Sequence, residues 1–197
     1  ENPLDAIQSQ FKIASRNPDV LKDAIETGML HLWWRENGMD LRQRRHRAEF
    51  EAVLQRVRPE IVFMGPMYKL FRRAKNEDME QVAIEVAEVF DDLRVRYDFA
   101  LVLEHHAPSA SGGGYREIKP FGSSVWQRWP EFGIALDVKN GASMTSDRYE
   151  VEVGRFRRDR LVADWPTELT RGTSASVAWH ARFEPGRGNV FKPGFVR

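Results

Sequence analysis

Residues 58–106 constrain the fold most, because two short apolar runs flank one long amphipathic segment. Residues 61–64 and 99–103 are apolar at every position, which is typical of strands covered on both faces of a parallel sheet. Between them, residues 77–98 repeat apolar side chains at three- and four-residue steps, which predicts a helix with Asn76 as its N-cap. This order predicts a βαβ unit with a right-handed crossover.

The predicted unit also indicates where a ligand would bind. In open α/β sheets, ligands bind beyond the carboxyl ends of the strands. Gly65 and Pro66 follow the first predicted strand, and Glu104, His105 and His106 follow the second. We therefore expect these five residues to share one edge of the sheet.

The remaining pattern predicts further helices and strands within a single domain, residues 1–183, followed by a Gly/Pro/Arg-rich arm, residues 184–197. The predicted helices are residues 4–14, 19–27 and 42–57, and the predicted strands are residues 29–34, 132–138, 149–153 and 174–183, the last ones antiparallel. The fold class is therefore α/β, with a largely parallel sheet flanked by helices and antiparallel strands at the C-terminal side.

Composition excludes some classes of function. The 30 basic and 29 acidic residues nearly cancel, so a nucleic-acid site would have to depend on local basic patches. The chain has no cysteine, which excludes disulfides and thiolate metal sites and agrees with a cytoplasmic location. No apolar run approaches the roughly 20 residues that cross a bilayer, so we expect no membrane partner. We assign no metal-ligating side chain.

Three stretches carry a resemblance to a known family, namely residues 58–70, 103–107 and 121–125. They read Arg-Pro-Glu-Ile-Val-Phe-Met-Gly-Pro-Met-Tyr-Lys-Leu, Leu-Glu-His-His-Ala and Phe-Gly-Ser-Ser-Val. These motifs resemble the core of RecA-like P-loop ATPases, in the branch of RepA-type and DnaB-like hexameric replicative helicases and related AAA-family ATPases of actinobacteria and their phages. The resemblance covers about residues 1–140.

The resemblance implies a nucleic-acid-dependent ATPase that binds ATP and Mg²⁺ at a subunit interface of a homo-oligomeric ring, such as a hexamer, around single-stranded DNA. The first strand would be the Walker B strand, with Gly65, Pro66 and Ser123 at the nucleotide. Glu1 would activate water, His105 would sense the γ-phosphate, and Arg128 would reach the nucleotide of the neighbouring subunit.

Two departures from the family pattern concern the phosphates and the metal. No Gly-Lys pair occurs in the chain, so the Walker A motif is absent, and family order would place it before Glu1. The strand that would supply an aspartate to the Mg²⁺ hydration shell ends instead in Gly65. This glycine also fits a second function, a non-hydrolysing RecA-fold adaptor or regulator that oligomerises and binds DNA or protein.

Several residues have two interpretations at this stage. His105 and His106 would project to opposite sides of a continued strand, so they are poor joint ligands for one metal ion. Glu104 is either a surface carboxylate or a substitute for the missing acid. Arg128 either acts as the finger or stacks on a neighbouring indole, and Ser123 either binds nucleotide or caps a helix.

The nucleic-acid candidates lie in two loops. Arg72, Arg73 and Lys75 follow the Walker-B-like strand on the predicted ligand edge. The Gly-rich segment 107–120 corresponds to the pore loop in the RecA-like pattern; alternatively, it is a flexible surface connection. In it, cationic side chains suit phosphate contact and an aromatic ring suits base stacking. The candidates there are Tyr115, Arg116 and Lys119.

Overall fold

The computed structural model describes residues 18–106, 120, 122–138, 150–156, 168–170 and 180–182. The chain separates into two compact units, one formed mainly by residues 31–130 and one by residues 2–30 together with residues 131–197. Helices and strands occur in both, and each unit has its own sheet in the described part of the chain. The predicted mixture of helix and strand is therefore confirmed.

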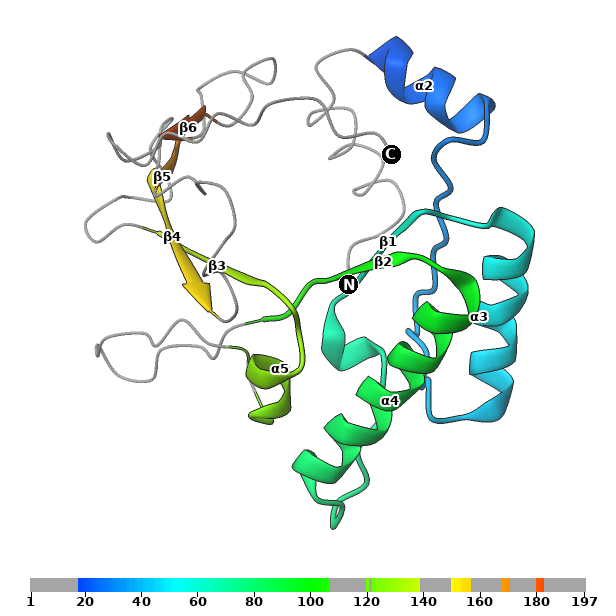
Figure 1. Ribbon diagram of the computed structural model, residues 1–197, viewed down its shortest axis with the longest axis vertical. Coiled ribbons are helices and arrows are strands. Elements are labelled where there is room, and N and C mark those ends of the chain that lie inside the picture. The colour runs from blue at the N-terminus through cyan, green and yellow to red at the C-terminus, as the bar shows by residue number, and fades with distance from the viewer. Residues whose placement is uncertain are drawn as a thin grey trace. The chain divides into compact units, whose positions relative to one another are not determined.

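The first unit contains the predicted strand, helix and strand. Strands β1 (Ile61–Met64) and β2 (Ala100–Leu103) are parallel and directly hydrogen-bonded, and the helix α4 (Met79–Tyr97) connects them (Figure 1). Their register runs from Ile61 opposite Ala100 to Met64 opposite Leu103. The unit also contains α3 (Arg44–Val57), the 3-10 helix η1 (Met67–Lys69) and the short helix α5 (Val125–Arg128).

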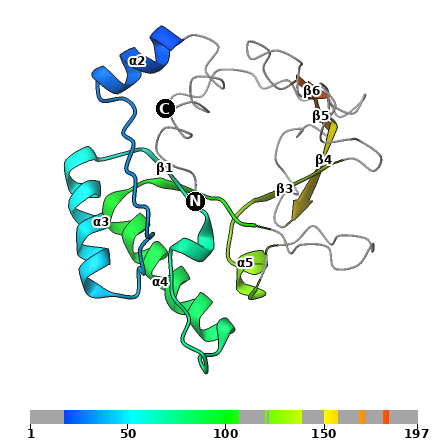
Figure 2. The same cartoon turned by 180° about the vertical axis from the view of Figure 1, so that it is seen from behind.

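Helix α4 buries the face that its periodicity predicts. Val82, Val86, Phe90 and Leu93 are buried, and burying each of these side chains stabilises the fold by about 1.5–3 kcal/mol. Helices α3 and α4 lie side by side in both ribbon views (Figures 1 and 2). The core that they form also takes residues from the segment before α3, from η1 and from α5.

The predicted N-cap of α4, Asn76, is wrong. The N-cap is Asp78, whose carboxylate accepts the backbone N–H of Glu80 at 3.2 Å. Glu77 is held outside the helix, because its carboxylate accepts the backbone N–H of Ala74 at 2.7 Å. These local hydrogen bonds start the helix two residues after the position that composition indicated.

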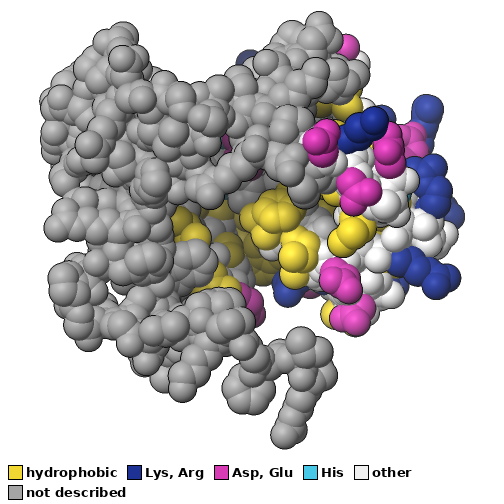
Figure 3. Space-filling model, turned by 90° about the horizontal axis from the view of Figure 1, so that it is seen from above, with side chains coloured by type: hydrophobic (Ala, Val, Ile, Leu, Met, Phe, Trp, Pro, Cys, Tyr) yellow, Lys and Arg dark blue, Asp and Glu magenta, His cyan; other side chains and the backbone are white. Residues whose placement is uncertain are grey.

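The prediction that both faces of β1 and β2 are covered is also wrong. Burial alternates along each strand, so one face packs on the core and the other is open. On the open face Ile61, Phe63 and Val102 are exposed, Phe63 by 75%. Figure 3 shows hydrophobic side chains at the described surface, beside a region where acidic and basic side chains alternate. A four-residue apolar run cannot distinguish a doubly covered strand from a singly covered one.

The strand predicted at residues 29–34 is not formed. This segment has no strand pairing, and most of its large apolar side chains are exposed. Trp33 instead stacks on Phe50 of α3, with ring centroids 5.8 Å apart. An apolar run forms a strand only where another strand edge accepts its backbone hydrogen bonds.

The second unit contains α2 (Pro18–Glu26) and a four-stranded antiparallel sheet in the order β3-β4-β5-β6. The strands are β3 (Gly133–Val138), β4 (Glu150–Phe156), β5 (Glu168–Thr170) and β6 (His180–Arg182). The antiparallel pairing predicted for the C-terminal strands is confirmed for these residues. The predicted helix at residues 4–14 and the arm at residues 184–197 lie outside the described residues. Within the described part, no helix has the length and apolar character needed to cross a membrane.

Candidate functional site

The carboxyl ends of β1 and β2 lie together, as the sequence predicts. The backbone N–H of Glu104 donates to the carbonyl of Met64 at 2.8 Å, which continues the strand pairing by one bond. The carbonyl of Glu104 accepts the N–H of Met67 at 2.9 Å. Gly65 and Pro66, joined by a cis peptide bond, therefore lie beside the segment that carries His105 and His106. We call residues 65–68 and 104–106 the strand-end site.

Gly65 is glycine for reasons of space. A Cβ atom at this position would lie 2.9 Å from Oε2 of Glu104, and closer still to its Cβ. Real Cβ atoms essentially never approach another heavy atom within 3.0 Å. Gly65 is not among the residues with positive φ, so its backbone conformation does not require glycine. The side chain of Glu104 thus occupies the room that a side chain on residue 65 would need.

His105 is half-buried, with its ring centroid 6.1 Å from that of Trp126 in α5. Its Nδ1 lies 2.9 Å from the carbonyl oxygen of His106, and because a carbonyl only accepts, Nδ1 carries the hydrogen. Burial lowers the pKa of His105. The neutral ring therefore presents Nε2 as an acceptor.

His106 has different neighbours from His105. It is exposed, its ring meets Tyr68 edge-on at 5.4 Å, and its Nε2 lies 3.5 Å from Oε1 of Glu104. The prediction placed the two imidazoles on opposite sides of a continued strand, but β2 ends at Leu103 and neither histidine is in a strand.

The donor set at this edge suits one kind of cation. In the described residues no group of three or more His, Asp or Glu side chains comes together in a way that could hold a metal ion. Mg²⁺ needs no such cage, because it keeps several waters and is held through one or two carboxylates together with substrate phosphates. Glu104, exposed by 67% at its side chain, fits that requirement.

Arg128 and Ser123 converge on one carboxylate, that of Glu80 in the first turn of α4. Glu80 accepts hydrogen bonds from the hydroxyls of Ser123 and Ser124, the latter at 2.9 Å, and from the Arg128 guanidinium at 2.5 Å. The hydrogen bond from Ser123 is the main cause that lowers the pKa of Glu80. Ser123 also accepts the backbone N–H of Val125, the first residue of α5, at 3.0 Å, whereas the N-cap residue itself is Ser124.

This Glu80 cluster was missed by the sequence analysis. Glu80 lies 43–48 residues from its three partners, so no local pattern in the sequence links them. Trp126, which α5 carries to His105, was not among the predicted site residues. The Arg128 guanidinium pairs with Glu80, and the cation–π contacts found among the described residues involve Arg35 and Arg96.

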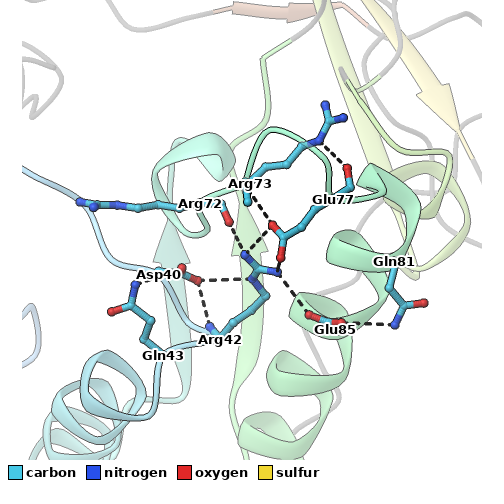
Figure 4. A network of polar contacts seen from close by, with 9 residues as sticks. Asp40, Arg42, Gln43, Arg72, Arg73, Glu77, Gln81 and Glu85 are labelled. Carbon is cyan, nitrogen blue, oxygen red and sulfur yellow. Dashed lines mark hydrogen bonds and ion pairs between the residues drawn. The ribbon is translucent and has the colours of Figure 1, made fainter.

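Arg72, Arg73 and Lys75 lie in the loop between η1 and α4, and their side chains are exposed. Figure 4 shows the cause of the loop's shape: Arg42 donates to the carbonyl of Arg72 and to both carboxylate oxygens of Glu77. Arg73 is itself engaged, because its Nε donates to the carbonyl of Glu77 at 2.8 Å.

Arg42 is the residue that organises this loop. Besides Glu77 it pairs with Glu85 of α4 at 3.4 Å and with Asp40 at 3.6 Å (Figure 4). The hydrogen bond from Arg42 is the largest cause that lowers the pKa of Glu77. This role of Arg42 is not apparent from the sequence.

Four of the predicted site residues lie outside the described part of the chain. They are Glu1, Tyr115, Arg116 and Lys119. His106, in the strand-end site, directly precedes the Gly-rich segment, and Pro120, the last residue of that segment, comes shortly before Ser123 and Ser124 in the chain.

Comparison with known proteins adds no assignment. Neither the family profiles, nor the curated proteins, nor the solved structures give a significant match to this chain.

Proposed function

We propose that this chain belongs to a RecA-like, nucleic-acid-dependent ATPase of the replicative helicase or recombinase type, which acts as a homo-oligomeric ring. The observation that carries the proposal is the register of β1 and β2, in which Met64 lies opposite Leu103. That pairing brings the Gly-Pro turn and the Glu-His-His segment to the same edge, where α/β sheets bind ligands. ATP and Mg²⁺ are the proposed ligands, and the proposal requires a phosphate-binding loop outside these 197 residues.

His105 is the proposed sensor of the γ-phosphate. In the neutral ring Nδ1 is bonded to the His106 carbonyl and Nε2 lacks a hydrogen, so it cannot donate to phosphate. A triphosphate within about 4–6 Å would favour the charged imidazolium, which then donates from Nε2. Nucleotide binding would thus be coupled to proton uptake, and Trp126, in contact with His105, would carry the change to α5.

Arg128 is the proposed finger that reaches a neighbouring subunit. Its side chain is 65% exposed, and its contact is with Glu80 of its own chain. A guanidinium that serves the nucleotide of another subunit must leave this carboxylate, and a fixed positive charge there would stabilise the transition state of phosphoryl transfer. In the single chain, Glu80 therefore binds the guanidinium that would otherwise be available to the neighbouring subunit. Glu1 is the proposed group that activates water.

Single-stranded DNA is the proposed nucleic-acid partner. Arg42 fixes the backbone of the loop that carries Arg72 and Lys75. The side chains of Arg72 and Lys75 are exposed and take no part in the Arg42 network, so their charges can contact phosphates. Tyr115, Arg116 and Lys119 would add a stacking ring and phosphate contacts from the Gly-rich segment.

One observation favours a second candidate, a non-hydrolysing RecA-fold adaptor. Strand β1 ends at Met64 and is followed by Gly65, where no side-chain oxygen is available to the metal. An assay of ATP hydrolysis by the full-length protein separates the two candidates, because the adaptor binds without turnover.

The decisive experiment measures single-stranded DNA binding by the full-length protein with and without a non-hydrolysable ATP analogue. We expect tighter binding with the analogue and a strong salt dependence. Arg116→Ala should weaken binding, whereas Arg56→Ala, an exposed change of the same charge in α3, should leave it unchanged. Binding that ignores both nucleotide and salt would contradict the proposal.

A further inference from the structure

Glu104 is held in a defined position at the strand-end site. Its backbone N–H and carbonyl are both hydrogen-bonded, to Met64 at 2.8 Å and to Met67 at 2.9 Å. The Cα and Cβ atoms of Glu104 therefore have fixed positions, and only the part of the side chain beyond Cβ can rotate.

From that origin the side chain extends over the end of the neighbouring strand. A Cβ on Gly65 would fall 2.9 Å from Oε2 of Glu104. A carboxylate carried by residue 65 would have to start from the same point. The two positions therefore compete for one place, and in this chain the carboxylate comes from β2.

Three properties make this carboxylate suitable for a metal ion. It is 67% exposed, so water and a ligand can reach it. Its Oε1 lies 3.5 Å from Nε2 of His106, so the carboxylate has an imidazole of the same edge beside it. It also lies at the carboxyl ends of two parallel strands, beside the half-buried His105.

We propose that Glu104 supplies, from the end of β2, the carboxylate that the end of β1 lacks, and that it holds the Mg²⁺ of a Mg–nucleotide complex through the hydration shell of the ion. This inference rests on the proposed nucleotide-binding function. The lack of a carboxylate at Gly65 is then compensated, because the acid follows the neighbouring strand, β2. Glycine is required at residue 65 for this arrangement, since any side chain there would clash with Glu104.

The test is the Mg²⁺ dependence of nucleotide affinity in the full-length protein, measured with a fluorescent ADP analogue in Mg²⁺ or in EDTA. Glu104→Gln keeps the size of the side chain and removes its charge. We expect the variant to bind nucleotide in EDTA as well as the natural protein does. The factor by which Mg²⁺ raises nucleotide affinity should be about 10–100 times smaller in the variant than in the natural protein. Glu60→Gln is the matched control, because Glu60 is also exposed and precedes β1, at the opposite end of the strand.

A second variant tests the exchange of position directly. In Gly65→Asp/Glu104→Gly, the carboxylate returns to β1 and the glycine moves to β2, so both residues fit. We expect this double variant to recover most of the Mg²⁺ gain. As a readout independent of affinity, Mn²⁺ with nucleotide should broaden the NMR resonances of His106 in the natural protein and much less in Glu104→Gln.

The outcomes distinguish the inference from the function on which it rests. If Glu104→Gln and Glu60→Gln show the same Mg²⁺ gain, Glu104 does not hold the metal, while nucleotide binding stands. If the natural protein binds the ADP analogue equally well in EDTA, the metal role is likewise excluded. If it binds no nucleotide under either condition, the proposed function fails together with the inference.

Discussion

Gly65 and Glu104 should be thermodynamically coupled, and Gly65→Ala measures the coupling. The added methyl group would overlap Cβ of Glu104, an atom at the root of the side chain that rotation cannot remove. Relief requires the backbone of Glu104 to shift, which strains its bonds to Met64 and Met67. Overpacking of this kind costs about 1–3 kcal/mol.

The sign of the effect should reverse when Cβ of residue 104 is removed. At a position with ordinary φ, glycine to alanine stabilises a protein by about 0.4–1 kcal/mol, because the unfolded chain loses freedom. Gly65→Ala should therefore destabilise the natural protein and be neutral or stabilising in the Glu104→Gly background. The expected coupling energy is about 1–4 kcal/mol, which overlaps the range that contacting residues show.

The assay is urea unfolding followed by circular dichroism and tryptophan fluorescence, with coincident transitions as the test of two-state behaviour. Glu104→Ala is the matched control, because it deletes the carboxylate but keeps Cβ. Gly65→Ala should remain costly in that background. An equal cost in the Glu104→Ala and Glu104→Gly backgrounds would refute the steric argument.

Three further outcomes follow from the structure. Gly38→Ala should be severely destabilising, because Gly38 has φ +64° and a Cβ there would lie 2.9 Å from Cβ of Lys69, whereas Gly122→Ala, at φ +99° with nearest contacts of 3.8 Å, should show backbone strain alone in the same urea assay. Arg42→Ala should lower the free energy of unfolding by about 1–3 kcal/mol through loss of its charged hydrogen bonds, while Arg56→Ala should change it by less than about 0.5 kcal/mol. An NMR titration should find the pKa of His105 in the folded protein below 6.5. The unfolded chain then takes up the proton at a higher pH than the folded chain does. The contribution of His105 to the free energy of unfolding should therefore fall as the pH drops below 6.5 and through the folded pKa.

The sequence predicted the first unit well where the signal is local and periodic. The spacing of Val82, Val86 and Phe90 gives the buried face of α4, and two apolar runs joined by a helix give parallel neighbours. The C-terminal ends of α3 and α4 were predicted to within one residue, whereas both helices begin two residues later than predicted, at Arg44 and Met79.

The rest could not be predicted because it depends on residues far apart in the chain. Glu80 meets Arg128 across 48 residues, and Arg42 meets Glu77 across 35. Neither pairing leaves a periodic trace in the sequence. The same holds for the contact between Gly65 and Glu104, which exists only because the register of two strands places their ends together.

That contact changes how the chemistry of the strand-end site is to be judged. Taken singly, Gly65 is a missing ligand and Glu104 is an exposed acid, and each reading favours a protein that has lost turnover. Taken together, the two positions can hold only one side chain between them. A side chain at residue 65 would clash with Glu104 in its present position, and with Glu104 present only glycine fits at residue 65. The edge keeps one carboxylate in either arrangement, so the glycine at the end of β1 is not by itself an argument against ATP hydrolysis.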